Sequence, residues 1–133
     1  MKLVNLTPHA VSVFDHASAQ LLKRAGDMDE FRALLAKHPP LLRLPSSGMA
    51  RVDVERVLVD ALRLPEGVIP IYRSQFTSRV HDLPDPQPGV RYVVSAIVLR
   101  ACPERSDLLV PVEGVRDPHG RIVGCTGFDV REG

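Results

Sequence analysis

The sequence contains no tryptophan, only two cysteines, and no apolar run that approaches the roughly 20 residues of a membrane-spanning helix. Cys102 and Cys125 are too few for a disulfide framework, so we expect two reduced thiols in a reducing compartment. The N-terminus becomes polar at Asn5, before the apolar core of a signal peptide could form. These absences predict a soluble, cytoplasmic protein that does not contact a membrane.

Charge of one sign and aromatic side chains are also scarce. The net charge is +1 and aromatic residues make up 5% of the chain, so we expect no nucleic acid among its partners. Lysine occurs only at positions 2, 23 and 37, and the other basic residues are arginines. Arginine binds phosphates and carboxylates through two parallel hydrogen bonds, which would suit an anion site. A GC-rich genome is the alternative explanation, and the abundance of alanine, valine and proline favours it.

What the sequence does contain is typical of one globular domain. The chain has 133 residues, of which 44% are hydrophobic and 25% charged, enough for a self-sufficient core. Short β-branched segments lie between turn residues, with few helical patterns among them. We therefore predict a single domain over residues 1–133 of the α+β class, a small curled, mostly antiparallel sheet or partial barrel of hairpins. One capped helix over about 27–38 and one short helix over about 96–102 complete it.

The clearest helical signal begins at Asp27. Asp27 and Glu30 have the D-x-x-E spacing of a reciprocally capped helix, and Phe31, Leu34 and Leu35 then share one helical face. Two prolines follow and end the helix. A weaker helical turn precedes it in the sequence.

The middle of the chain predicts a long hairpin. Residues 50–62 fit both a strand and a helical face, and we favour a strand with a bulge near Glu55 and Arg56 because valine dominates. Residues 68–80 are also extended, and the turn formers at 64–67 join the two segments.

Strands are also predicted near both ends of the chain. At the start, two strands flank Thr7-Pro8-His9, where Pro8 disfavours a helix and holds His9 rigidly. At the end, two strands flank the turn sequence that begins at Asp117, which predicts a second hairpin.

A candidate ligand site lies where a strand ends at Ser95, a good N-cap for the short helix that follows. Unpaired N–H groups at a helix start attract anions, and Arg51 and Arg73 come from strands that would neighbour it. We therefore predict Arg51, Arg73, Ser95 and His9 as ligand-binding residues. Simple capping by Ser95 and solvated arginines are the favoured alternative interpretation.

Complete catalytic signatures are missing. No zinc spacing, phosphate-binding loop or dinucleotide fingerprint occurs, so no metal and no cofactor is predicted. His9 is the best candidate for a catalytic base, with Asp107 or Cys125 as its partner. A structural role for His9, with its ring bonded to the backbone, is the favoured interpretation. Cys125 lies in a predicted strand, so a buried, inert thiol is the favoured interpretation of that residue.

Several short motifs occur together in a fixed order. They are Asn5-Leu6-Thr7-Pro8-His9, Ser47-Gly48 with Ala50-Arg51-Val52, Leu83-Pro84-Asp85-Pro86, Tyr92-Val93-Val94-Ser95, and Val115-Arg116-Asp117 with Gly120-Arg121-Ile122-Val123-Gly124. In this order the chain resembles a group of small uncharacterised proteins of phages, prophages and actinobacterial or cyanobacterial genomes. Relative to that pattern, residues 17–42 are a probable helical insertion. The resemblance implies a phage-like context and supplies no catalytic residues.

The leading hypothesis for function is a non-catalytic binding or interaction protein of phage or mobile-element type. Such a protein would sequester a small anionic ligand or engage a host protein. The first alternative is a small hydrolase or transferase that uses His9 as its base. The second is a structural accessory subunit of a larger assembly, which predicts exposed apolar patches and oligomerisation.

Overall fold

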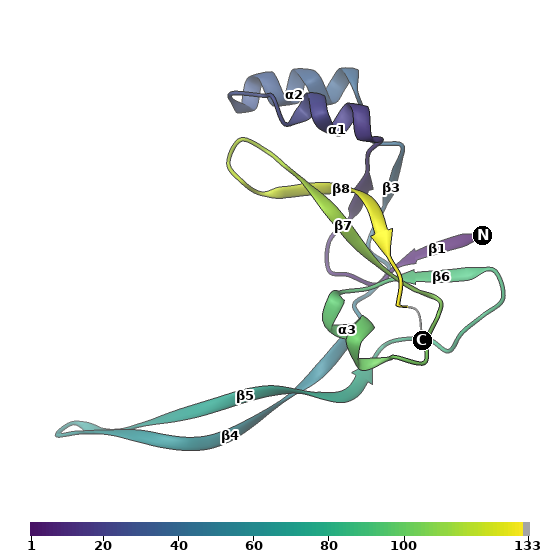
Figure 1. Ribbon diagram of the computed structural model, residues 1–133. Coiled ribbons are helices and arrows are strands. Elements are labelled where there is room, and N and C mark those ends of the chain that lie inside the picture. The colour runs from purple at the N-terminus through teal and green to yellow at the C-terminus, as the bar shows by residue number, and fades with distance from the viewer. Residues whose placement is uncertain (132–133) are drawn as a thin grey trace.

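The computed structural model describes residues 1–131 (Figure 1). These residues form eight strands and three helices. In chain order the elements are β1 (Lys2–Asn5), β2 (Val11–Val13), α1 (His16–Leu22), α2 (Met28–Lys37), β3 (Leu42–Leu44), β4 (Arg51–Leu64), β5 (Gly67–His81), β6 (Val90–Val93), α3 (Ala96–Ala101), β7 (Leu108–Arg116) and β8 (Ile122–Asp129). The predicted α+β class is confirmed. None of the helices in the described part of the chain is long and apolar enough to cross a membrane.

Six strands form one curled sheet in the order β1-β6-β7-β8-β2-β3. A bridge between Asn5, at the end of β1, and Ser46, just after β3, brings the two edges together, so the sheet is nearly closed. Three of its pairings, β1 with β6, β6 with β7 and β2 with β8, are parallel. The sequence analysis expected mostly antiparallel pairing, so the main sheet is more mixed than predicted.

The first two strands are present as predicted, but they do not pair with each other. β1 lies beside β6 at one edge of the curled sheet, and β2 lies between β8 and β3 near the other. Residues 6–10 therefore carry the chain across the closing edge instead of reversing it in a hairpin. Local turn signals around Pro8 could not distinguish these two paths, because both need a bend there.

Two apolar clusters hold this body together. The first lies between the sheet and α3, and the second lies where α1 and α2 pack on the end of the β7–β8 hairpin. The residues buried in the first are Leu6, Ala50, Tyr92, Val94, Val98, Cys102 and Leu108; those in the second are Phe14, Ala19, Leu22, Phe31 and Val115.

The predicted helix caps are confirmed. The Asp27 carboxylate accepts a hydrogen bond from the Glu30 backbone N–H at 2.8 Å, and the Glu30 carboxylate accepts one from Gly26 N–H at 3.0 Å. Ser95 Oγ accepts a hydrogen bond from Val98 N–H at the start of α3. The weak turn before α2 is a full helix, α1, which Asp15 caps. Whether residues 17–42 are an insertion stays a prediction.

The long hairpin of β4 and β5 is also confirmed, and it extends away from the body (Figure 1). Residues 50–62 are thus a strand, as favoured. Its irregularities lie between Val52 and Val54 and between Leu58 and Asp60. The bulge predicted near Glu55 and Arg56 is wrong, because the pairing is regular from Val54 to Leu58. Val54 and Val57 therefore lie on opposite faces of the strand, and both are exposed. We call residues 51–81 the arm.

Candidate functional site

The motif around His9 has a structural role that closes the sheet. Asn5 is 1% exposed, and its amide donates hydrogen bonds to the carbonyl oxygens of His9 at 2.8 Å and Leu44 at 3.0 Å. Its side-chain oxygen accepts from the backbone N–H and hydroxyl of Thr7, at 3.0 and 2.6 Å. All its hydrogen-bonding groups are used, so Asn5 ties β1 to β3 and fixes the loop that carries His9.

His9 and Ser95 lie at two adjoining cavities. His9 lines a cavity of about 280 Å³ and Ser95 lines one of about 340 Å³. The two share five lining residues, Thr7, Pro111, Ile122, Gly124 and Cys125. The fold therefore gathers three residues that the sequence singled out, His9, Ser95 and Cys125, although they are far apart in the chain.

The chemistry of these cavities is largely neutral. Among the described residues that line the two cavities, Glu113 is the only acidic one, and none is lysine or arginine. The Glu113 carboxylate accepts a hydrogen bond from the Thr126 hydroxyl at 2.8 Å. Burial raises the pKa of the Cys125 thiol, which keeps it protonated and a poor nucleophile. The lining suits a small uncharged or weakly polar ligand better than an anion.

The two arginines predicted for the ligand site lie elsewhere. Arg51 stands opposite His81 at the base of the arm, and Arg73 stands opposite Val57 farther out. Both side chains are exposed, and neither lines the cavities of His9 and Ser95. The predicted group of four thus divides into two pairs. The sequence pattern predicts strands at both arginines but does not predict the direction in which the arm extends.

Asp107, a predicted partner of His9, belongs to a separate clamp. The Arg105 guanidinium donates to both carboxylate oxygens of Asp107 at 2.8 Å, and it also donates to the Pro84 carbonyl at 2.9 Å. These hydrogen bonds hold the pKa of Asp107 below its usual range, against the opposing effect of burial. The clamp fastens the proline-rich connector to the start of β7, and Asp107 lines neither of the cavities described above.

Asp117 orders the turn between β7 and β8. Its carboxylate accepts from the backbone N–H groups of His119 and Arg121, at 2.9 and 3.0 Å, and from Arg121 Nε at 3.1 Å. Burial alone would raise the pKa of Asp117, but these donors outweigh it and the pKa is lowered. The Arg-Asp and Gly-Arg motifs in this region therefore have a structural explanation.

The most unusual surface in the molecule lies on the arm. Eleven large apolar side chains of the arm are between 37% and 62% exposed: Val54, Val57, Leu58, Val59, Leu62, Leu64, Val68, Ile69, Ile71, Tyr72 and Phe76. We call these eleven residues the apolar arm surface. This surface was not predicted from the sequence, although a signal was present. Apolar residues of β4 and β5 fall on both faces, whereas a strand covered on one side shows them on one face.

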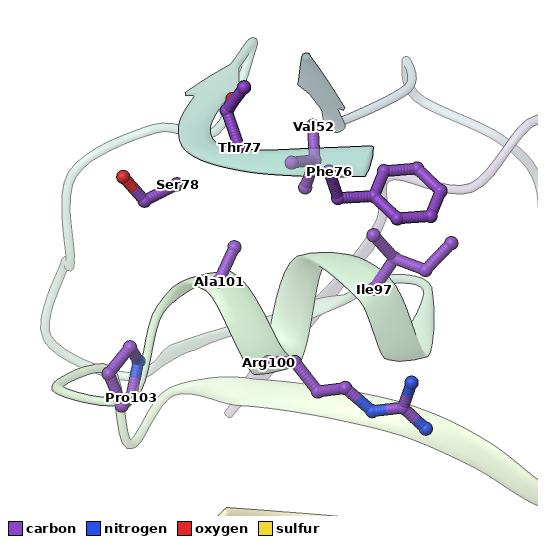
Figure 2. A pocket seen from close by; sticks show the side chains of 8 residues that line it. All are labelled: Val52, Phe76, Thr77, Ser78, Ile97, Arg100, Ala101 and Pro103. Atoms are coloured by element: carbon purple, nitrogen blue, oxygen red, sulfur yellow. The ribbon is translucent and has the colours of Figure 1, made fainter. Parts of the chain in front are cut away.

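A groove connects the apolar arm surface to the body. A cavity of about 480 Å³ lies between the arm and α3, and Figure 2 shows Phe76 beside Ile97 of the helix, with Val52 close by. The Arg100 guanidinium points away from them (Figure 2). The apolar surface thus continues from the arm onto α3.

Polar groups stiffen the base of the arm next to this groove. His81 Nε2 lies 2.7 Å from Asp53 Oδ1, and the Thr77 hydroxyl donates to the Asp53 carbonyl at 3.2 Å. The hydrogen bond from His81 lowers the pKa of Asp53. These contacts fix the point from which the arm leaves the body.

Comparisons with protein-family models, with curated proteins and with solved structures found no match to this chain. Within residues 1–131, no group of three or more histidine, cysteine, aspartate or glutamate side chains is placed to hold a metal ion.

Proposed function

We propose that this chain is a non-catalytic interaction protein that binds other protein surface through its arm. The observation that carries the proposal is the apolar arm surface, whose eleven large apolar side chains are between 37% and 62% exposed. Single exposed apolar side chains are ordinary on a monomer, whereas neighbouring ones along the whole of a hairpin are not. Such a concentration indicates a surface that a partner binds.

The arm also lacks support from its own chain. A two-stranded hairpin is marginally stable in water unless a third strand or a helix packs on it. Only its base, at Val52 and Val80, packs against the core cluster beside α3. The outer part gains such support when a protein partner covers it.

The non-catalytic character of the proposal rests on the same geometry. A hydrolase that used His9 as its base would need Asp107 or Cys125 beside it in a reactive state. Arg105 binds both carboxylate oxygens of Asp107, and burial raises the pKa of the Cys125 thiol. The phage-like context of the proposal rests on the sequence motifs alone, and the cytoplasmic context rests on the expectation that the two cysteines are reduced.

The test is the composition of native complexes isolated from cells that make the protein. We expect the wild type in a stoichiometric complex, which the double variant Leu58→Glu, Tyr72→Glu does not form. Leu41→Glu is the matched control, because Leu41 is 71% exposed and lies outside the arm. A complex that survives the double variant, or a wild type that forms none, would overturn the proposal. If this chain is an accessory subunit of a larger assembly, the native complex should contain more than one further protein.

A second candidate function is favoured by the cavities of His9 and Ser95, which form a concave site of the size small ligands use. We expect a small ligand of low charge to raise the melting temperature of the wild type and not of His9→Ala. A panel of nucleotides and uncharged metabolites provides the measurement, and it also tests the predicted anionic ligand. If no compound shifts the melting temperature, this candidate is rejected.

A further inference from the structure

The charges of the arm indicate what kind of surface covers it. They include both signs in nearly equal number, which disfavours a partner of strong single charge such as a nucleic acid. A second copy of the same arm is close to neutral and carries both signs as well. The basic residues are Arg51, Arg56, Arg63, Arg73 and Arg79, and the acidic ones are Asp53, Glu55, Asp60 and Glu66.

Along β4, two pairs of residues at equal distances before and after Leu58 carry opposite charges. Arg56 and Asp60 lie two residues on either side of Leu58, and Asp53 and Arg63 lie five residues on either side. When a second β4 runs antiparallel and crosses at Leu58, each arginine stands level with an aspartate of the other copy. The bulge between Leu58 and Asp60 shifts these levels by about one residue, roughly 3.3 Å, which the length of an arginine side chain spans.

The edges of the arm favour contact through β4. Pro70 in β5 has no backbone N–H, so it interrupts the donors along the outer edge of that strand. β4 contains no proline over its 14 residues. The edge of the arm that remains open to another strand is therefore that of β4.

A two-fold arrangement suits this edge. It uses the same β4 edge on both copies, so the contact closes on itself and does not propagate into a fibre. Joining the two hairpins through β4 makes a four-stranded sheet, which gives each two-stranded hairpin the additional strands that its stability requires.

On these grounds we infer that the partner of the arm is the arm of a second copy, antiparallel to it, with Leu58 near the two-fold axis. The inference rests on the proposed function, because it names the protein that covers the arm. The dimer is closed, and Leu58 lies beside Leu58 of the second copy at its centre.

Two charge variants and sedimentation equilibrium test this arrangement. Arg56→Asp and Asp60→Arg each place like charges opposite one another, so we expect each alone to raise the dimer dissociation constant by about 10-fold or more. An equimolar mixture of the two restores the opposite-charge pairs, and we expect it to form a heterodimer as tight as the wild type. Leu41→Glu, away from the arm, should leave the wild-type constant unchanged.

A disulfide experiment fixes the crossing point. Leu58→Cys should give a covalent dimer on mild oxidation, whereas Leu41→Cys should not; Cys102 and Cys125 are buried and do not compete. A wild type that is monomeric at all concentrations, or a mixture that fails to recover, overturns the inference. If the wild type is a monomer but the arm variants still lose another protein from the native complex, the proposed function survives without the dimer. If neither association exists, both fail.

Discussion

The body and the arm are built from the same strand-forming residues, but the body buries their apolar side chains and the arm exposes them. In the body, Val94 and Leu108 are completely buried between the curled sheet and α3. In the arm, Leu58 and Phe76 are 62% and 59% exposed. The difference shows that composition and periodicity define a strand. The residues that bury its side chains are distant in the chain or belong to another molecule.

The largest expected effect is in the body, at Gly124. A Cβ atom there would lie 2.5 Å from Phe14 Cε2 and 2.7 Å from the Ser12 carbonyl oxygen, because β2 packs directly on β8. We expect Gly124→Ala to lower the free energy of unfolding by about 3 kcal/mol, as overpacking against backbone does. Urea denaturation measures it. Gly127→Ala in the same strand is the control, because its nearest contact would be an ordinary 3.8 Å.

The next effect concerns the closure of the sheet. Asn5→Ala removes the hydrogen bonds that this buried side chain makes with His9, Leu44 and Thr7, so we expect a loss of about 2–3 kcal/mol. The comparable arm contact, between Gln75 and Glu55 at 3.2 Å, is exposed. Gln75→Ala should therefore cost less than about 0.5 kcal/mol. Equal losses in the two urea titrations would contradict the contrast between body and arm.

A smaller effect depends on pH. Because the pKa of Asp107 is lowered in the folded state, its clamp with Arg105 stabilises the protein fully above the unfolded pKa of about 3.9. That contribution is lost as the pH falls through the folded pKa. Asp107→Asn should therefore destabilise the protein at pH 6, and its difference from the wild type should shrink as the pH falls below about 3.9, as measured by urea midpoints. Asp29→Asn, at a carboxylate that is 98% exposed, serves as control.

The smallest expected effect on stability is in the arm. We expect the double variant Leu58→Glu, Tyr72→Glu to change the unfolding free energy of the body by less than about 0.5 kcal/mol at low concentration. Both side chains are more than half exposed and lie outside the core clusters. Calorimetry at several protein concentrations separates this value from the stability that self-association adds. A large loss at high dilution would show that the arm is part of the core.

Local features of the structure could be predicted from the sequence, and long-range ones could not. Asp27 with Glu30, and Ser95, specify helix starts through bonds within a few residues, so both caps were predictable. The parallel pairing of β1 with β6 joins residues about ninety positions apart, and no local pattern specifies it.

The candidate site follows the same division. His9 and Ser95 could be singled out because a proline and a helix start mark them, but their meeting at adjoining cavities depends on the closure that Asn5 makes. Arg73 was misplaced because its strand pattern is the same whether the hairpin folds onto the body or extends from it. The apolar arm surface went unnoticed because apolar residues in a strand are ordinarily assigned to a core.

Hydrogen exchange of the arm amides tests most directly the claim that another copy covers the arm. At a concentration where the wild type is dimeric, the account predicts slow exchange across residues 54–76. The double variant Leu58→Glu, Tyr72→Glu should exchange these amides rapidly while the body amides keep their wild-type rates. If the arm amides exchange at the same rate in the wild type and in the variant, the claim that a second copy binds the arm is contradicted.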